Sequence, residues 1–351
     1  GGVQLDETTM ASVLSEGAKA AIDIGWGESE DLLAIESNGL LDSSEINVGE
    51  RAQKRGMKAL GTLGSGNHFL ELQIVDRIED PLAAKAYGLR EGQVTAMIHT
   101  GSRGLGHQVC SEHVAKIERK YQRDGDHWVA PDWDYRLQDR QLAAAPIFSR
   151  EGAAYLDAMR AAGNYAFANR SALTQRLRNV LRNKLGVDGE LDVVYDVSHN
   201  IAKVEDHIVH GKSCKCCVHR KGATRALGGD HPELANRFSS VGQPVLVPGD
   251  MGTASWVLAG PKTGSNDAFS SSCHGAGRQL SRTAARKSVD SSALIKRLEE
   301  SGIHVRAKTP NVLAEEAPEA YKDVDEVIAL TEAANLARPV ARLRPFAVIK
   351  G

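Results

Sequence analysis

Residues 61–75 read GTLGSGNHFLELQIV, a glycine-rich polar turn that leads into a strand. Phe69, Glu71, Gln73 and Val75 alternate with Leu70, Leu72 and Ile74, so one face of this strand is apolar and the other mostly polar. The stretch predicts a sheet in which a strand end carries a polar turn rich in glycine.

Three further apolar runs repeat this arrangement, and we expect strands at residues 94–98, 191–197 and 244–248. They run into polar turns that begin at His99, Ser198 and Gly249. Mixed α/β proteins bind ligands where strand ends converge on one rim, so we expect these turns to line a cleft.

Helical spacing of apolar residues predicts helices between these strands. The sequence therefore favours an α+β fold, a single mixed domain over residues 1–351 with a central β core and surrounding helices. Repeats and Pro/Ser-rich linkers are absent from the sequence. The helices are expected at residues 10–24, 49–60, 108–122, 150–184, 292–300 and 324–338, with a hairpin at 208–218 around Gly211 and a last strand at 346–349 that runs into Lys350.

The composition of the 351 residues is that of an ordinary globular protein, with 42% hydrophobic residues and a net charge of −2. No run is long enough to cross a bilayer, so we expect no membrane association. Five cysteines in a chain of this length do not form a disulfide framework, which favours the cytoplasm. The balanced charge argues against a protein that coats nucleic acid, although a local basic groove remains compatible with it.

Residues 270–286, SSSCHGAGRQLSRTAAR, combine a histidine, two glycines and three regularly spaced arginines. We expect Gly275 and Gly277 to allow a close backbone approach to a ligand, and a helix to follow with its arginines on one face. A glycine turn that opens a helix suits phosphate, and His274 beside it is a candidate nucleophile. The alternative is an ordinary helix entry with a solvated arginine face.

Histidines stand in three of the turns, and neutral imidazole is the commonest transition-metal ligand. His68, His99 and His199 are far apart in the sequence, so no local spacing supports a shared metal. A structural, hydrogen-bonded role for each remains open.

Residues 207–219 contain a dense group of cysteines and histidines that invites a structural zinc site. The C-x-C-C spacing differs from the paired C-x2-C knuckles of zinc ribbons. Alternate residues of a hairpin also face opposite sides, so a plain hairpin is the favoured interpretation. The group comprises His207, His210, Cys214, Cys216, Cys217 and His219.

Familiar nucleotide-binding motifs are missing from the sequence. Gly211-Lys212-Ser213 lacks the upstream glycine of a P-loop, because position 206 is Asp206. Neither G-x-G-x-x-G after a strand nor the K-x-D-G of lysine nucleotidyltransferases occurs. If the protein activates a phosphate with a nucleotide, His274 is the candidate to carry it.

Taken together, these turns resemble one family, the RtcB-type tRNA-splicing and RNA-repair ligases. The matching segments occur in order and span most of the chain. They are GTLGSGNHFLE (61–71), HTGSRGLGHQV (99–109), YDVSHNIAKVE (195–205), HRKGATRA (219–226), PGDMGTASWVL (248–258), SSCHGAGRQLSR (271–282), EEAPEAYKD (315–323) and ARLRPFAVIKG (341–351).

The resemblance implies joining of an RNA 3′-phosphate or 2′,3′-cyclic phosphate to a 5′-hydroxyl, with GTP and Mn²⁺ as cofactors. It implies that His274 takes GMP from GTP and that His68, His99 and His199 hold the metal. RNA ends would be the substrate, Arg278 and Arg282 would meet RNA phosphates, and the small protein archease is a possible partner. The implied nucleotide pocket comprises Asn67, His68, Phe69, Leu70, Glu71, His199, Asn200, Pro248, Gly249, Asp250, Met251, Ser255, His274, Gly275, Ala276, Gly277 and Lys350.

One departure concerns a short D-x-x-C element whose Asp and Cys complete the metal sites of the family. The sequence lacks it, since residues 24–27, Ile-Gly-Trp-Gly, have the glycines but no cysteine. We therefore expect the amino-terminal part of the family domain to be absent. Two alternatives stay open, a truncated or inactive homologue that binds GTP or RNA and a metal-dependent phosphohydrolase.

Overall fold

The computed structural model describes residues 2–186 and 191–351. The chain divides into two compact units, one of residues 1–32, 37–62 and 101–189 and the other of residues 33–36, 63–100 and 190–351. Helices and mainly antiparallel sheets together confirm the predicted α+β class. The organisation as a single domain stays a prediction.

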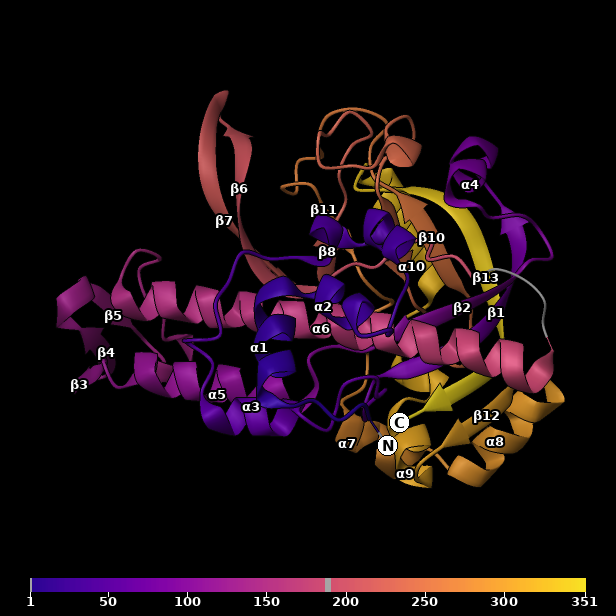
Figure 1. The fold of residues 1–351 in the computed structure, drawn as a ribbon, viewed down its shortest axis with the longest axis horizontal. Helices are drawn as coiled ribbons and strands as arrows, with labels where there is room; N and C mark the ends of the chain where they lie inside the picture. Colours follow the sequence, from indigo (N-terminus) through magenta and orange to yellow (C-terminus); the bar gives the residue numbers. More distant parts are fainter. Residues whose placement is uncertain (1, 187–190) are drawn as a thin grey trace. The chain divides into compact units, whose positions relative to one another are not determined.

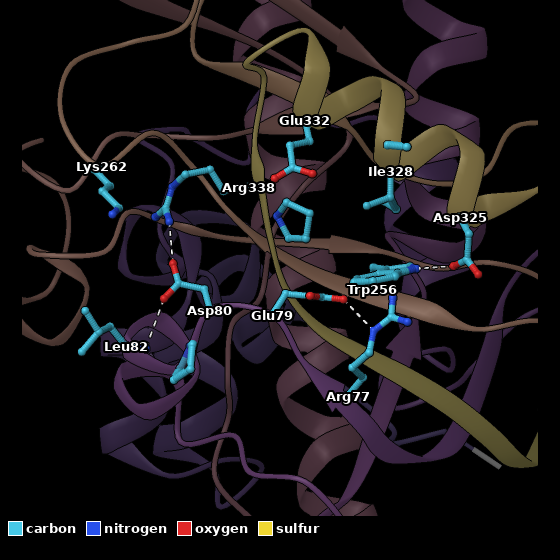
Figure 2. A pocket seen from close by; sticks show the side chains of 13 residues that line it. Arg77, Glu79, Asp80, Leu82, Trp256, Lys262, Asp325, Ile328, Glu332 and Arg338 are labelled. Carbon is cyan, nitrogen blue, oxygen red and sulfur yellow. Dashed lines mark hydrogen bonds and ion pairs between the residues drawn. The ribbon is translucent and has the colours of Figure 1, made fainter.

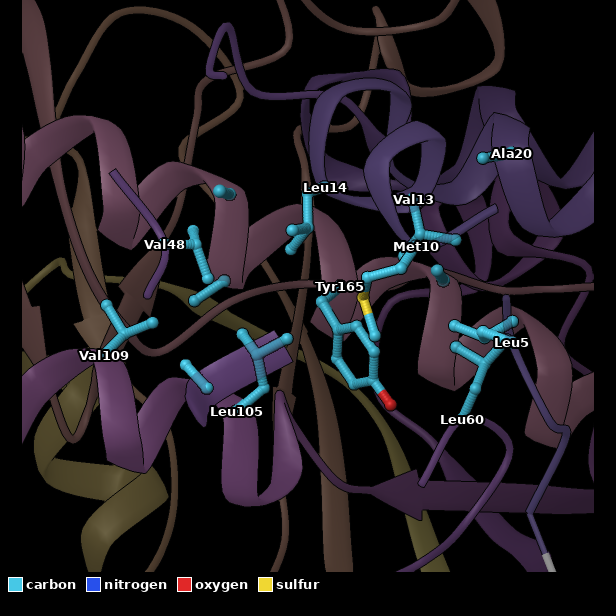
Figure 3. Packing of buried hydrophobic residues seen from close by; sticks show 14 of the residues in the cluster. Leu5, Met10, Val13, Leu14, Ala20, Val48, Leu60, Leu105, Val109 and Tyr165 are labelled. Atoms are coloured by element: carbon cyan, nitrogen blue, oxygen red, sulfur yellow. The ribbon is translucent and has the colours of Figure 1, made fainter. Parts of the chain in front are cut away.

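The first unit is built around α6 (Arg150–Leu185), a helix of 36 residues. Many of the buried residues of α6 are small, and residues 164–169 are buried without interruption, so this part of the helix is packed on all sides. Figure 3 shows Tyr165 of α6 in this core, with Met10 and Leu105 nearby, and none of the three side chains is exposed. The other elements are α1 (Glu7–Glu16), α2 (Ala18–Asp23), α3 (Glu50–Gly56), α5 (Arg103–Glu118) and a three-stranded sheet of β3 (Gln122–Asp124), β4 (His127–Ala130) and β5 (Tyr135–Leu137).

The single helix expected at residues 10–24 is two helices. Gly17 adopts φ of 63° at the end of α1, a conformation that glycine accepts at little cost, and α2 starts at the next residue. Asp6 caps the amino end of α1 by accepting a hydrogen bond from the Thr9 amide.

The second unit contains a six-stranded sheet with the order β2-β1-β13-β10-β9, in which β12 pairs with β13 in parallel (Figure 1). The strands are β1 (Phe69–Ile78), β2 (Val94–His99), β9 (Pro244–Val247), β10 (Ser255–Ala259), β12 (His304–Ala307) and β13 (Arg338–Lys350). In β1 the buried face is the one that carries Glu71 and Gln73. The polar side of the sequence pattern is thus turned inward.

The predicted hairpin around Gly211 is confirmed and is longer than expected. Figure 1 shows its two strands, β6 (Asn200–Val209) and β7 (Lys212–Lys221), side by side. The remaining elements of this unit are α4 (Pro81–Tyr87), β8 (Ala223–Arg225), β11 (Ser271–Cys273), α7 (Arg282–Ser288), α8 (Ser291–Glu300), α9 (Pro310–Glu315) and α10 (Val324–Ala333). The short 3₁₀ helices of the chain are η1 (Ser29–Ala34), η2 (Glu36–Gly39), η3 (Pro131–Trp133), η4 (Arg140–Leu142), η5 (Asn236–Phe238) and η6 (Pro318–Ala320).

Two further expectations were wrong. Residues 191–197, all of which the structure describes, form no strand, and their β-pairing is limited to an isolated bridge between Asp196 and Ile35. The helix expected at 324–338 ends at Ala333, and residue 338 already belongs to β13. Among the helices of the described residues, none combines the length and apolar character needed to span a membrane.

A buried asparagine ties α6 to the segments before it. Asn164 is 0% exposed, and its side-chain amide donates to the carbonyls of Leu14 and Leu41, both at 2.8 Å. Its Oδ1 accepts from the Leu41 amide at 2.8 Å. We predict that Asn164→Ala lowers the free energy of unfolding by about 2–4 kcal/mol, because buried backbone groups lose their partners.

Urea denaturation followed by circular dichroism measures this loss. Asn183→Ala, at an exposed position of the same helix, is the control and should change stability by less than about 0.5 kcal/mol. Equal effects of the two substitutions would contradict the prediction.

Candidate functional site

Three histidines from separate parts of the second unit meet at one place. The Nε2 atoms of His99 and His199 lie 3.0 Å apart, and the rings of His199 and His274 are stacked with centroids separated by 3.5 Å. One nitrogen from each of the three rings lies within 4.8 Å of the others. The arrangement is a set of donors that could hold a metal ion.

Strand pairing explains why His199 and His274 are neighbours. The Gly222 amide donates to the His199 carbonyl at 3.2 Å, at the start of the hairpin. The next residue, Ala223, pairs with Cys273 in the β8–β11 ladder. His274 follows directly, so two short ladders bring it beside His199 although 74 positions separate them in the sequence.

The six-stranded sheet supplies the other two histidines. Phe69 of β1 pairs with His99 of β2, and the two rings meet edge to face at 5.4 Å. His68, one residue earlier, has its ring centroid 5.8 Å from that of His99. The structure therefore brings all four expected histidines together, with His68 at the border of the three-donor group.

Desolvation keeps the imidazoles of His99 and His274 neutral near pH 7. Desolvation lowers the pKa of His99 well below its usual value, and the neighbouring His274, His199 and His68 lower it further. Desolvation, with a smaller contribution from the positive charge of Lys221, lowers the pKa of His274 to about 4. A neutral imidazole has a lone pair that can bind a transition metal or attack an electrophile. The donor set fits a first-row transition metal, and manganese in particular stays a prediction.

A second buried group lies at the ends of β1 and β13. Glu71 is 3% exposed and accepts a hydrogen bond from the Gln73 side chain at 2.8 Å. Burial, assisted by the charge of Asp250, raises the pKa of Glu71 to about 7. Lys350 pairs with Phe69, and its ammonium lies 5.1 Å from the centre of that ring. Burial lowers the pKa of Lys350, against the opposing charges of three carboxylates.

The turn at residues 248–255 is locked by its own hydrogen bonds. Asp250 accepts from the Gly252 amide at 2.8 Å, and Ser255 Oγ accepts from the Gly249 amide at 3.2 Å. The Ala276 amide donates to the Pro248 carbonyl at 3.3 Å, which places this turn beside the one that follows His274. The side chains of Met251 and Ser255 are each 1% exposed, so they support the turn from inside.

The remaining expected pocket residues take different positions. Asn200 is exposed, and its Oδ1 accepts from Lys221 at 2.9 Å. Asn67 lies half-buried in the turn before β1, and Leu70 is half-buried on the face of β1 opposite Glu71.

The helix expected directly after the glycine turn was wrong. Gly277 has φ of 78°, but Gly275 does not have a positive φ, and α7 begins only at Arg282 with Ser281 as its cap. In the intervening segment Arg278 forms a β-bridge with Tyr321, and the chain then bends at Gln279 and Leu280. The glycine turn is therefore not a helix amino terminus, and phosphate binding of that kind is excluded there.

The expected solvated arginine face is found only in part, since the side chains of Arg282 and Arg286 are 50% and 49% exposed and that of Arg278 is 24% exposed. Glu316 is 1% exposed, and its Oε1 accepts from Arg278 and Arg282, both at 3.2 Å. Arg278 donates further to the Glu315 carbonyl at 2.6 Å and the Tyr321 hydroxyl at 3.1 Å, which commits most of its donors. The Arg282 side chain is 50% exposed, so it has the better access to a ligand.

The sequence offered no signal for one acid that supports the site. Glu36 is 1% exposed and accepts a hydrogen bond from the Ser198 amide at 2.7 Å, immediately before His199. It also pairs with Lys203 at 2.5 Å. Glu316 and Lys221 were missed in the same way, because only the fold brings them to the histidines or arginines. Both lie in segments that carry the family resemblance, and this resemblance was the one feature of the sequence that could have marked them as site residues.

A separate open pocket is lined by residues of β1, α4, β10 and α10 and by none of the four histidines (Figure 2). Its charged groups are largely paired with one another, as Figure 2 shows for Arg338 with Asp80 and Arg77 with Glu79. The Trp256 indole donates to Asp325 at 2.7 Å. We therefore assign the candidate site to the histidine cluster.

Comparison with known proteins gives one consistent match. The family model described as "tRNA-splicing ligase RtcB" matches residues 1–351. The chain is 48% identical to "tRNA-splicing ligase RtcB" of Thermococcus kodakarensis, with all of the chain and 72% of the relative covered. It is 49% identical to "RNA-splicing ligase RtcB" of Mycobacterium tuberculosis, with 99% of the chain and 77% of the relative covered. It covers 40% of the Pyrococcus horikoshii relative, at 47% identity.

The raised pKa of Glu71 predicts a stability that depends on pH. The folded state holds a proton on Glu71 between the unfolded pKa of 4.5 and the folded pKa of about 7, so this carboxyl destabilises the fold progressively as the pH rises through that window. We expect wild type to lose about 2–3 kcal/mol relative to Glu71→Gln between pH 4.5 and pH 8.

Urea unfolding of both proteins across this range provides the measurement. Glu299→Gln, at an exposed position of α8, is the control, and its free energy of unfolding should depend on pH in the same way as that of wild type. If the free energy of unfolding of Glu71→Gln also depends on pH as that of wild type does, the fold does not raise the pKa of Glu71 and the prediction is contradicted.

Proposed function

Because the chain belongs to the RtcB family of tRNA-splicing ligases, we propose that it is an RNA ligase that acts in tRNA splicing or RNA repair. It would join an RNA 3′-phosphate or 2′,3′-cyclic phosphate to a 5′-hydroxyl with GTP as the second substrate. The observation that carries the proposal is the position of His274, stacked at 3.5 Å on His199 inside a cluster of half-buried imidazoles.

His274 is the proposed nucleophile. Its pKa of about 4 leaves the ring neutral at pH 7, so a ring nitrogen can attack the α-phosphorus of GTP. A P–N bond forms, the bond to pyrophosphate breaks, and the imidazole retains the GMP. The GMP then passes to the RNA 3′-phosphate, and the 5′-hydroxyl displaces GMP as the new phosphodiester forms.

His68, His99 and His199 are the proposed metal ligands. They would leave the His274 lone pair for the nucleotide, since one lone pair cannot bind a metal and phosphorus together. Mn²⁺, when bound, would neutralise the triphosphate charge and favour departure of pyrophosphate. The low pKa of His99 supports this assignment, because a protonated ring cannot serve as a ligand.

Glu71 and Lys350 are the proposed guanine contacts. An ionised Glu71 can accept from both N1–H and N2–H₂ of guanine, and Lys350 can donate to O6. Adenine presents neither this pair of donors nor this acceptor, so the pair would select GTP over ATP. Both side chains are almost fully buried, which strengthens each contact.

RNA ends are the proposed partners, with Arg282 as the phosphate contact. Arg278 has its donors occupied by Glu316, Glu315, Leu280 and Tyr321, which fits a supporting role better. Assistance by archease and a location in the cytoplasm remain predictions.

The first prediction from this mechanism is a covalent label on His274. Incubation with GTP labelled at the α-phosphate and Mn²⁺, followed by a denaturing gel, should give a labelled band that is labile in acid and stable in alkali. His274→Ala should abolish the label, whereas His210→Ala, at the exposed hairpin tip, should retain it.

The other outcomes distinguish the alternatives. An unlabelled wild type would indicate a homologue that binds without ligating. GTP hydrolysis without an adduct would indicate a phosphohydrolase. A label that persists in His274→Ala would move the nucleophile to another residue.

A second prediction separates RNA binding from guanylylation. Arg282→Ala should reduce ligation about 10- to 100-fold by removing one charge-assisted phosphate contact, and it should leave labelling with GTP almost unchanged. Arg286→Ala, one helical turn further along α7 and paired with Glu315 at 3.5 Å, is the control with little expected effect. An equal loss of labelling and ligation in Arg282→Ala would argue for a structural role.

A further inference from the structure

The β6–β7 hairpin separates its cysteines and histidines into two faces. His207 lies directly opposite Cys214, and Glu205 directly opposite Cys216. Paired residues of an antiparallel ladder share a face, as do alternate residues of one strand. The two thiols, the imidazole and the carboxylate therefore lie on one half-buried face, whereas Cys217 lies on the other face.

We propose that His207, Cys214 and Cys216 form a binding site for a thiophilic divalent cation such as Zn²⁺, distinct from the histidine cluster. Cross-strand Cβ atoms are about 4.5–5.5 Å apart, and zinc bonds to sulfur and nitrogen are about 2.0–2.3 Å long. The three donor atoms do not all lie within 4.8 Å of one another in this structure, so rotation of the Cys214 and Cys216 side chains toward His207 is the movement that would bring the donors onto one ion. Two thiolates and one imidazole form a zinc-type ligand set with a fourth position open to water.

The orientation of His207 supports this site. Its Nε2 lies 3.0 Å from the Glu205 carboxylate, which can only accept, so Nε2 is the donor and Nδ1 is the ring atom left for a cation. Arg220 fixes Glu205 with two hydrogen bonds of 2.6 and 2.9 Å. A carboxylate that holds the distal N–H of a histidine is the usual support of a metal-binding imidazole.

Arg220 is in turn anchored to the body of the second unit. It is 3% exposed and donates to the Phe269 carbonyl at 2.9 Å and to Ser271 Oγ at 3.0 Å. The Phe269 ring also meets the His207 ring edge to face at 5.2 Å. The imidazole is therefore held in place before any cation arrives.

The two thiols lie in positions that favour a shared ion. The Cys216 Sγ contacts the Cys214 carbonyl at 3.8 Å, so its side chain leans back along the strand toward Cys214. None of the five cysteines, all of which lie in the described residues, is in a disulfide. Cys217 Sγ instead lies 3.6 Å from His219 Nε2 on the opposite face, which makes it a matched control one residue away.

Titration of the full chain with Co²⁺ tests the proposal. Thiolate ligands give cobalt an intense near-ultraviolet charge-transfer band, which a site made of imidazoles cannot produce. We expect one equivalent of this band in wild type, displaced by Zn²⁺. Cys214→Ser, Cys216→Ser and His207→Gln should each weaken cobalt binding by at least about 10- to 100-fold, the usual loss when even a supporting group is removed.

Cys217→Ser and Cys273→Ser should retain the band, with far-ultraviolet circular dichroism as the check of folding. Absence of the band in wild type would overturn the proposal. Loss of the band in Cys217→Ser or Cys273→Ser, together with its retention in Cys214→Ser, would also overturn the proposal. Neither result bears on the proposed ligase, because guanylylation of His274 is measured separately.

Discussion

The ionised carboxylate of Glu36, buried next to the amide of Ser198, is the constraint on which the site depends. Burial alone would raise the pKa of Glu36, but Lys203, Arg225 and the Ser198 amide bring it down to about 2. The same Ser198 offers its carbonyl to the Thr224 hydroxyl at 3.2 Å, which connects the segment before β6 to β8. Removing the carboxylate would take one counter-charge from both Lys203 and Arg225, a costly change for buried cations. The segment that carries His199 is thus fixed by electrostatics where ladder hydrogen bonds are few.

The opposite wall of the site is fixed by strand register. Phe69 is paired with His99 on one side and Lys350 on the other. The start of β1 and the ends of β2 and β13 therefore lie at the same level of the sheet. A slip of one residue in β13 would turn Lys350 to the other face of the sheet and remove it from Glu71. Because β13 also pairs with β10 and β12, such a slip would break several ladders at once. This shared strand explains how a lysine near the carboxyl end can be held at a buried position.

The sequence predicted those parts of the fold that depend on local pattern. The hairpin around Gly211 and strands β1, β2 and β9 follow from apolar runs and turns, and the resemblance identified the histidines that the fold brings together. The pattern failed where distant partners decide the outcome. Residues 191–197 have a strand-like composition but lack a neighbouring strand, and the segment after Gly277 is kept from a helix by its bridge to Tyr321. Glu36 and Glu316 lie among ordinary surface-like residues in the sequence, and only the fold buries them.

Desolvation shifts the pKa values of His274 and Glu71 in opposite directions. It disfavours whichever form is charged, so it lowers the pKa of His274 to about 4 and raises that of Glu71 to about 7. The His274 imidazole is consequently neutral at pH 7, the form that the proposed attack on a nucleotide requires, so no base is needed to deprotonate it. Glu71 stands near its midpoint, so a ligand that offers two N–H donors can draw out its ionised form, whereas a ligand without them cannot. Desolvation thus keeps the lone pair of the His274 ring available at pH 7 and leaves Glu71 near the midpoint of its titration.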